Sequence, residues 1–384
     1  MTPSRLALLA LLWFTGVYLR VPVLVAPALA PQIGSELDLG AAGVGALTTL
    51  PVLMLGLGAL PGAWLIGRLG ARRALVTAVA LTALASAARG LAPPAALLFA
   101  ATAVMGFGIA VMQPALPAIV ARWCPGFTAL AVAVYMNGML LGEFLGAGLT
   151  LPLIMPLTGN DWRLTLLVWS LPALLIAGLL TRPDDRAPDA EPATPGSILG
   201  GDRRMWSFGL ILGAASTLFF GTNAYMADLL AARGEAERLA ATLFWFNLSQ
   251  GAASLAMVPL APRLVARRGP VLATGLMAIT GGLAFLWNEG NTALIAAVLL
   301  GSATASQLIL MVAAAPHVVP PGDTGTFSAG MFAVGYGMAF AVPLAGGLLA
   351  ELFQRPQLPI WPMLAYGVLV LPLIARMDFH RRAG

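Results

Sequence analysis

The chain has 384 residues, of which 59% are apolar and only 10% charged, and its mean hydropathy is +0.88. Soluble domains carry about 25% charged residues, so the composition excludes a soluble enzyme, a nucleic-acid-binding protein and a disordered scaffold. The formal net charge is +5. Most arginines lie beside apolar runs, which is typical of the loops that flank transmembrane helices. One cysteine and two histidines are too few for a disulfide or a metal site, so we expect no metal and no cofactor.

Apolar runs long enough to cross a membrane recur along the whole chain. A helix rises about 1.5 Å per residue, so about 20 residues cross ~30 Å of hydrocarbon. The sequence therefore predicts an all-α integral membrane protein with twelve transmembrane helices. The runs are 7–30, 43–66, 74–92, 95–120, 128–154, 163–181, 205–227, 239–262, 270–287, 292–315, 325–350 and 359–376.

The distribution of arginine predicts the orientation of these helices. With both termini in the cytoplasm, 15 arginines fall in cytoplasmic segments and 5 in outer segments. Cytoplasmic loops carry an excess of arginine and lysine. We therefore expect a multi-pass protein of a bacterial inner membrane with both termini cytoplasmic.

The two halves of the chain resemble each other at a constant offset of 199 residues. Gly138 and Met139 correspond to Gly337 and Met338, and Arg68 and Gly70 correspond to Arg267 and Gly269. A polar stretch rich in proline and aspartate separates the halves and predicts a linker. We expect six-helix bundles over 1–181 and 205–384, a cytoplasmic linker over 182–204, and a binding site between the pseudo-symmetric bundles.

The loop after the second predicted span carries a recognisable motif. It reads Ala63-Trp-Leu-Ile-Gly67-Arg68-Leu-Gly70-Ala-Arg72-Arg73 and resembles the loop motif of the major facilitator superfamily, Gly-x-x-x-Asp-Arg-x-Gly-Arg-Arg. The arginines and the second glycine are present, whereas Gly67 stands where the family has aspartate. The resemblance implies a twelve-helix transporter in which Arg68 and Arg72 take part in gating.

Residues 15–125 also resemble one group within that superfamily, which contains cyanate permease and a 2-nitroimidazole exporter. The residues that carry this resemblance are Leu19-Arg20 with Pro27, Leu47-Thr-Thr-Leu-Pro51, Arg89, Gly106-x-Gly108-Ile-Ala110, Pro117 and Arg122. The second half matches only in general character.

Arg20 is the most informative single residue. It lies about 20 Å into the first span, where an arginine costs about 2.5–3.5 kcal/mol to insert. It therefore needs an anionic partner or a water-filled cavity. A guanidinium fits carboxylate, nitrate-like or cyanate anions. The alternative is a structural ion pair with Glu143.

Two further charges lie inside predicted spans. Glu143, in the fifth span, is either a proton carrier or the ion-pair partner of Arg20, since desolvation favours its neutral form. Arg89, in the third span, is either a second anion contact or gate, or an interfacial arginine that reaches lipid headgroups.

Several neutral polar residues fall near the middle of the membrane and are candidates to orient a small ligand, the alternative being contacts between helices. We interpret the aromatic runs at 219–220 and 244–246 as packing and lipid contacts. The candidate residues are Gln113, Asn137, Asn247, Gln250 and Tyr336.

Together these features predict a secondary transporter, not an enzyme, that moves a small anion by alternating access. The anion is an organic carboxylate or is cyanate- or nitrate-like. Transport with and without proton coupling through Glu143 are both alternatives. The alternative is a proton-coupled exporter of small neutral or weakly basic compounds. The expected partners are the anion, protons and lipid, with no nucleic acid, and the family resemblance implies a monomer.

Overall fold

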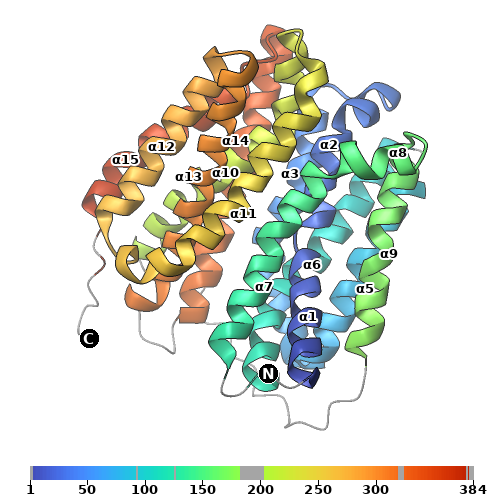
Figure 1. The fold of residues 1–384 in the computed structure, drawn as a ribbon, viewed down its shortest axis with the longest axis vertical. Coiled ribbons are helices and arrows are strands. Elements are labelled where there is room, and N and C mark those ends of the chain that lie inside the picture. Colours follow the sequence, from blue (N-terminus) through green and yellow to red (C-terminus); the bar gives the residue numbers. More distant parts are fainter. Residues whose placement is uncertain are drawn as a thin grey trace.

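The computed structural model describes residues 3–91, 94–124, 127–181, 203–318, 324–377 and 379. Most of the expected linker, 182–202, lies outside these residues. Within them every regular element is a helix. The helices of the first half, blue to green in Figure 1, lie beside those of the second half, yellow-green to red.

Each predicted span corresponds to a helix or to consecutive helical pieces. The first half contains α1 (Pro3–Val17), α2 (Val21–Glu36), α3 (Ala41–Leu57), α4 (Ala59–Leu69), α5 (Ala71–Leu91), α6 (Ala95–Trp123), α7 (Thr128–Glu143), η1 (Phe144–Gly148), η2 (Thr150–Ile154), α8 (Met155–Leu157) and α9 (Trp162–Leu180). The second half contains α10 (Arg203–Ala232), η3 (Ala236–Arg238), α11 (Leu239–Leu264), α12 (Arg268–Trp287), α13 (Gly290–Val318), α14 (Thr324–Phe353) and α15 (Ile360–Arg376).

Length and apolarity support the membrane assignment. Among the described residues, 8 helices are long and apolar enough to cross a membrane, or 9 if a bent pair counts as one span. The other three predicted spans do not meet these requirements of length and apolarity, each because of a local feature. The second is divided between α3 and α4, the eighth (α11) carries the amides Asn247 and Gln250, and the twelfth (α15) has 17 residues. The twelve-helix prediction is confirmed.

Two spans of the first half are interrupted near the middle. The first breaks between α1 and α2, where Arg20 is the N-cap residue and Pro22 follows in the first turn. Because proline has no N–H, the helical hydrogen-bond ladder is interrupted there. The fifth passes from α7 into the π-helical η1 directly after Glu143, and it bends by 53° further along, between Val134–Gly148 and Thr150–Leu157. Arg20 and Glu143 therefore both lie where a regular α-helix ends, whereas Arg89, in the third span, lies within α5.

Glycines bring α7 into close contact with α1. A Cβ atom at Gly138 would clash with the carbonyl oxygen of Trp13, and one at Gly142 would clash with that of Val17. From the other side, a Cβ atom at Gly16 would clash with the carbonyl oxygen of Tyr135. Small residues permit this approach, which holds the interruption after Glu143 close to that at Arg20.

Substitution of Gly142 by alanine is therefore expected to destabilise the protein by about 1–3 kcal/mol, as overpacking does. The added methyl group meets backbone, which cannot rotate away. The matched control is Gly178→Ala, because a Cβ atom there meets nothing within 4 Å. Thermal unfolding in detergent measures both variants, and equal melting temperatures would contradict this account of the helix contact.

A second set of close contacts joins the two halves, at the end predicted to face outward. Glu351 of α14 accepts a hydrogen bond of 2.9 Å from the backbone N–H of Ala42, in the first turn of α3. Tyr225 of α10 donates to the carbonyl of Pro343 at 3.0 Å, and its hydroxyl fills the space beside Gly45 and Gly347. Since α3 has no side-chain cap of its own, a carboxylate of the other half serves as its cap.

Removing this cap is expected to favour separation of the halves at that end. Loss of a helix cap costs about 1 kcal/mol, so Glu351→Ala should raise the population with the outer end open about fivefold. Spin labels at the exposed positions Ser35 and Gln354 report the distance between the halves. Glu351→Gln, which keeps an acceptor oxygen, should shift the distribution less, and identical distributions for all three proteins would refute the contact's role.

Candidate functional site

Arg20 reaches from the interruption in the first span towards the second half. Its Nε lies 3.1 Å from Oε1 of Glu143, a buried ion pair in which both side chains are almost fully inaccessible. Its Nη2 donates a 3.0 Å hydrogen bond to the hydroxyl of Tyr336 on α14. The guanidinium carbon lies 5.6 Å from the ring centre of Phe220 and 5.8 Å from that of Tyr336, within range of cation–π attraction. Arg20 thus connects the two halves through ionic, hydrogen-bonding and aromatic contacts.

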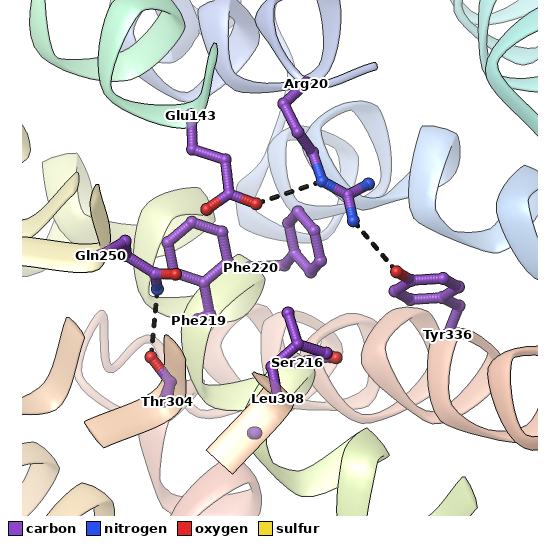
Figure 2. Close-up of a pocket in the computed structure, with 10 residues that line it drawn as sticks. Arg20, Glu143, Ser216, Phe219, Phe220, Gln250, Thr304, Leu308 and Tyr336 are labelled. Carbon is purple, nitrogen blue, oxygen red and sulfur yellow. Dashed lines mark hydrogen bonds and ion pairs between the residues drawn. The ribbon is translucent and has the colours of Figure 1, made fainter. Parts of the chain in front are cut away.

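These residues border a small cavity between the halves. The first half contributes Arg20 and Glu143, and α10, α11, α13 and α14 contribute the remaining walls. The cavity offers about 10 Å³ in which the centre of a water molecule can lie, which is room for about one water molecule. The lining residues are Arg20, Glu143, Ala215, Ser216, Phe219, Phe220, Gln250, Thr304, Leu308 and Tyr336 (Figure 2).

Two atoms of the ion pair keep unused hydrogen-bonding capacity. Among the described residues, buried Nη1 of Arg20 and Oε2 of Glu143 have neither a hydrogen-bond partner nor an ion-pair contact, whereas Nε of Arg20 makes the ion pair without forming a hydrogen bond. Burying such groups without partners costs free energy. Because both residues line the cavity, a ligand or water that reaches these atoms can complete their hydrogen bonds.

Of the neutral polar candidates, Gln250 and Tyr336 lie at this cavity. Gln250 donates from Nε2 to the hydroxyl oxygen of Thr304 at 3.1 Å, while Tyr336 holds Arg20. The structure does not bring the other three there. Asn137 accepts a hydrogen bond from Trp13 within the first half, Asn247 donates to Asn223 within the second, and Gln113 is absent from the lining.

Arg89 is buried, with 1% of its surface exposed. It donates from Nη2 to the carbonyl of Pro22 at 2.9 Å and to the hydroxyl of Ser86 at 3.1 Å. The interpretation of Arg89 as an interfacial residue that reaches lipid headgroups is therefore wrong, because the side chain is buried and its Nη2 donates to backbone next to the first interruption. It does not border the cavity.

The loop arginines Arg68 and Arg72 do not line the cavity and have partners elsewhere in the first half. The guanidinium of Arg68 stacks over Trp64 at 4.3 Å. Arg72 donates to the carbonyls of Leu180 and Thr181 at 3.1 and 2.5 Å, so it caps the C-terminal end of α9. Gating by either residue stays a prediction.

Four further lining residues are not among the candidates that the sequence predicts. Phe219 and Phe220, interpreted from the sequence as packing and lipid contacts, both line the cavity, as do Ser216 and Thr304. Figure 2 shows both rings in the middle of the group, among Arg20, Glu143 and Gln250. The only available signal was a set of residues 216, 219 and 220 at helical spacing, one turn apart on a common face.

Comparison with known proteins agrees with this architecture. The model of the Major Facilitator Superfamily matches residues 6–287. The chain belongs to the major facilitator superfamily. The cyanate transport protein CynX of Escherichia coli is 27% identical over 353 residues, 90% of each chain. The 2-nitroimidazole transporter of the same organism is 30% identical over 291 residues, 74% of this chain and 73% of that one.

A solved structure shows the same fold. The inward-open xylose transporter XylE from E. coli superimposes with a TM-score of 0.76 at 13% identity, covering 97% of this chain and 96% of that one. The resemblance to the group of cyanate and 2-nitroimidazole transporters is confirmed. This superfamily member is therefore a multi-pass membrane transporter.

Proposed function

We propose that this transporter moves a small anion through the cavity at Arg20 and that Glu143 couples the movement to protons. The observation that carries the proposal is a buried ion pair whose two residues line one cavity between the halves and retain atoms without a hydrogen-bond partner. A buried guanidinium that keeps a free N–H attracts an anion, and a carboxylate beside it is placed to take up a proton.

Charge balance explains why anion binding at Arg20 and protonation of Glu143 are coupled. Arg20 and Glu143 neutralise each other while paired at 3.1 Å. An anion on Arg20 would leave this buried site with a net negative charge, which desolvation opposes. A proton on Glu143 restores neutrality, frees Arg20 for the anion and gives Oε2 a hydrogen to donate. The anion and the proton then cross together as the halves rock about the cavity.

The same geometry supports a second candidate, a proton-coupled exporter of small neutral or weakly basic compounds. The paired site is neutral overall, and one relative is named a 2-nitroimidazole transporter. In that case Arg20 serves as the structural partner of Glu143, and the cavity selects ligands by hydrogen bonds rather than by charge.

Ligand-induced thermal stabilisation distinguishes the anion transporter from the exporter of neutral or weakly basic compounds. A ligand at a hundred times its dissociation constant adds about 2.7 kcal/mol to the unfolding free energy. We expect a small anion among cyanate, nitrate and simple carboxylates to stabilise the native protein but not Arg20→Ala. Stabilisation by neutral nitroimidazoles alone, retained in the variant, would reject the anion proposal in favour of the exporter.

A further inference from the structure

Within the anion proposal, the cavity walls distinguish between organic and inorganic anions. Only one lining residue, Arg20, is positively charged, and Glu143 is the only acid. The other eight lining side chains are neutral, and four of them (Ala215, Phe219, Phe220 and Leu308) are apolar. The walls therefore offer one place for a negative charge and an apolar surface beside it.

The aromatic side chains give that apolar surface a shape. Phe219 and Phe220 meet edge to face with ring centres 5.0 Å apart, and Phe219 stacks on Phe246 at 5.6 Å. Tyr336 stacks on Phe332 at 5.5 Å. These neighbours fix the rings, so the cavity is bordered by ordered aromatic walls, which favour planar partners.

An inorganic anion matches these walls poorly. Ring faces carry partial negative charge, so a cyanate or nitrate ion beside them loses its hydration and gains few donors in exchange. The cavity seen here has room for about one water molecule, so a larger ligand enters only when the halves separate. A carboxylate with an apolar body then uses both features, because its oxygens meet the guanidinium while its body covers the rings and Leu308 and gains hydrophobic stabilisation.

The opposite wall limits the ligand to a single charge. It is formed by Gln250, Thr304 and Ser216, and Gln250 donates to Thr304 at 3.1 Å. A second carboxylate there would face neutral groups without a cation. We propose that the transported anion is a planar organic monocarboxylate with an apolar body, in preference to an inorganic anion or a dicarboxylate. This inference rests on the proposed anion function.

The test measures dissociation constants by thermal stabilisation with benzoate, acetate, terephthalate and cyanate. We expect benzoate to bind at least 10-fold more tightly than each of the other three. Phe219→Leu removes a ring that does not stack on Arg20, and should lower the benzoate-to-acetate preference about 3- to 10-fold. Phe14→Leu, at a half-exposed ring outside the cavity, should leave it unchanged.

The outcomes of this test distinguish a wrong substrate class from a wrong proposal of anion transport. Cyanate or acetate binding as tightly as benzoate, with all binding lost in Arg20→Ala, would overturn the substrate class and leave the anion site standing. If none of the four anions stabilises the protein, both proposals fail. Should Phe219→Leu not fold, the preference of the unaltered protein among the four anions decides alone.

Discussion

Replacing Arg20 by alanine is expected to weaken anion binding about 10- to 100-fold and to reduce transport in proportion. Hydrogen bonds to charged groups contribute about 1.5–3 kcal/mol, and Nη1 is the buried donor left for a ligand. Lysine should not rescue the loss, because an ammonium cannot form the planar fork. Anion uptake into proteoliposomes measures the effect.

Stability needs its own control, because the alanine also leaves Glu143 buried without its cation, and breaking a buried pair costs about 3–5 kcal/mol. The double variant Arg20→Met with Glu143→Leu removes both charges and should regain stability without regaining anion binding. Arg163→Ala, which breaks a half-exposed ion pair with Glu36, should bind anions normally. Unchanged uptake by a folded Arg20→Ala protein would eliminate Arg20 as the anion-binding residue.

Replacing Glu143 by glutamine is expected to uncouple transport from protons. The amide keeps the shape of a protonated carboxyl group but cannot release a proton. Accumulation driven by a pH gradient should therefore disappear, while exchange of labelled for unlabelled anion continues within a few-fold of the native rate. Both assays use the same proteoliposomes.

Glu36→Gln is the matched control, because Glu36 pairs with Arg163 and Trp162 and lies outside the cavity. It should accumulate the anion normally. A Glu143→Gln protein that still concentrates the anion against a pH gradient would show that the proton takes another route.

The helical architecture could be predicted because the bilayer imposes it. Every span needs about 20 apolar residues, so hydropathy alone locates the helices. The interruptions could not be predicted in the same way. The run 7–30 is equally apolar whether the helix is continuous or breaks at Arg20, and the glycines that hold the breaks together acquire their role only from the opposing backbone.

The charged residues of the site could be predicted from the sequence. The neutral residues could not, because the sequence does not show which way their side chains point. A buried arginine requires a partner, and Glu143 was one of the few acids within reach. Neutral residues carry no such requirement. Asn137 and Glu143 are six residues apart, about 120° around a helix, so they face different neighbours. Because the helix is apolar on all sides, its sequence does not indicate which face borders the other half.

Equivalent positions in the two halves do not have equivalent places at the site. Asn137 and Tyr336 occupy equivalent positions in the repeat, yet only Tyr336 borders the cavity. Trp13 takes the amide oxygen of Asn137 at 3.1 Å, whereas Tyr336 receives Arg20 from the opposite half. Arg20, which comes from the first half, therefore makes the site asymmetric.

The most direct test of the account is the charge that crosses with each anion. A pH-sensitive dye inside proteoliposomes follows protons while labelled anion enters, and potassium with valinomycin sets the membrane potential. We predict one proton taken up per anion, acidification of the lumen, and an influx rate that is independent of the potential. Influx that follows the potential without acidification would contradict the joint crossing of anion and proton.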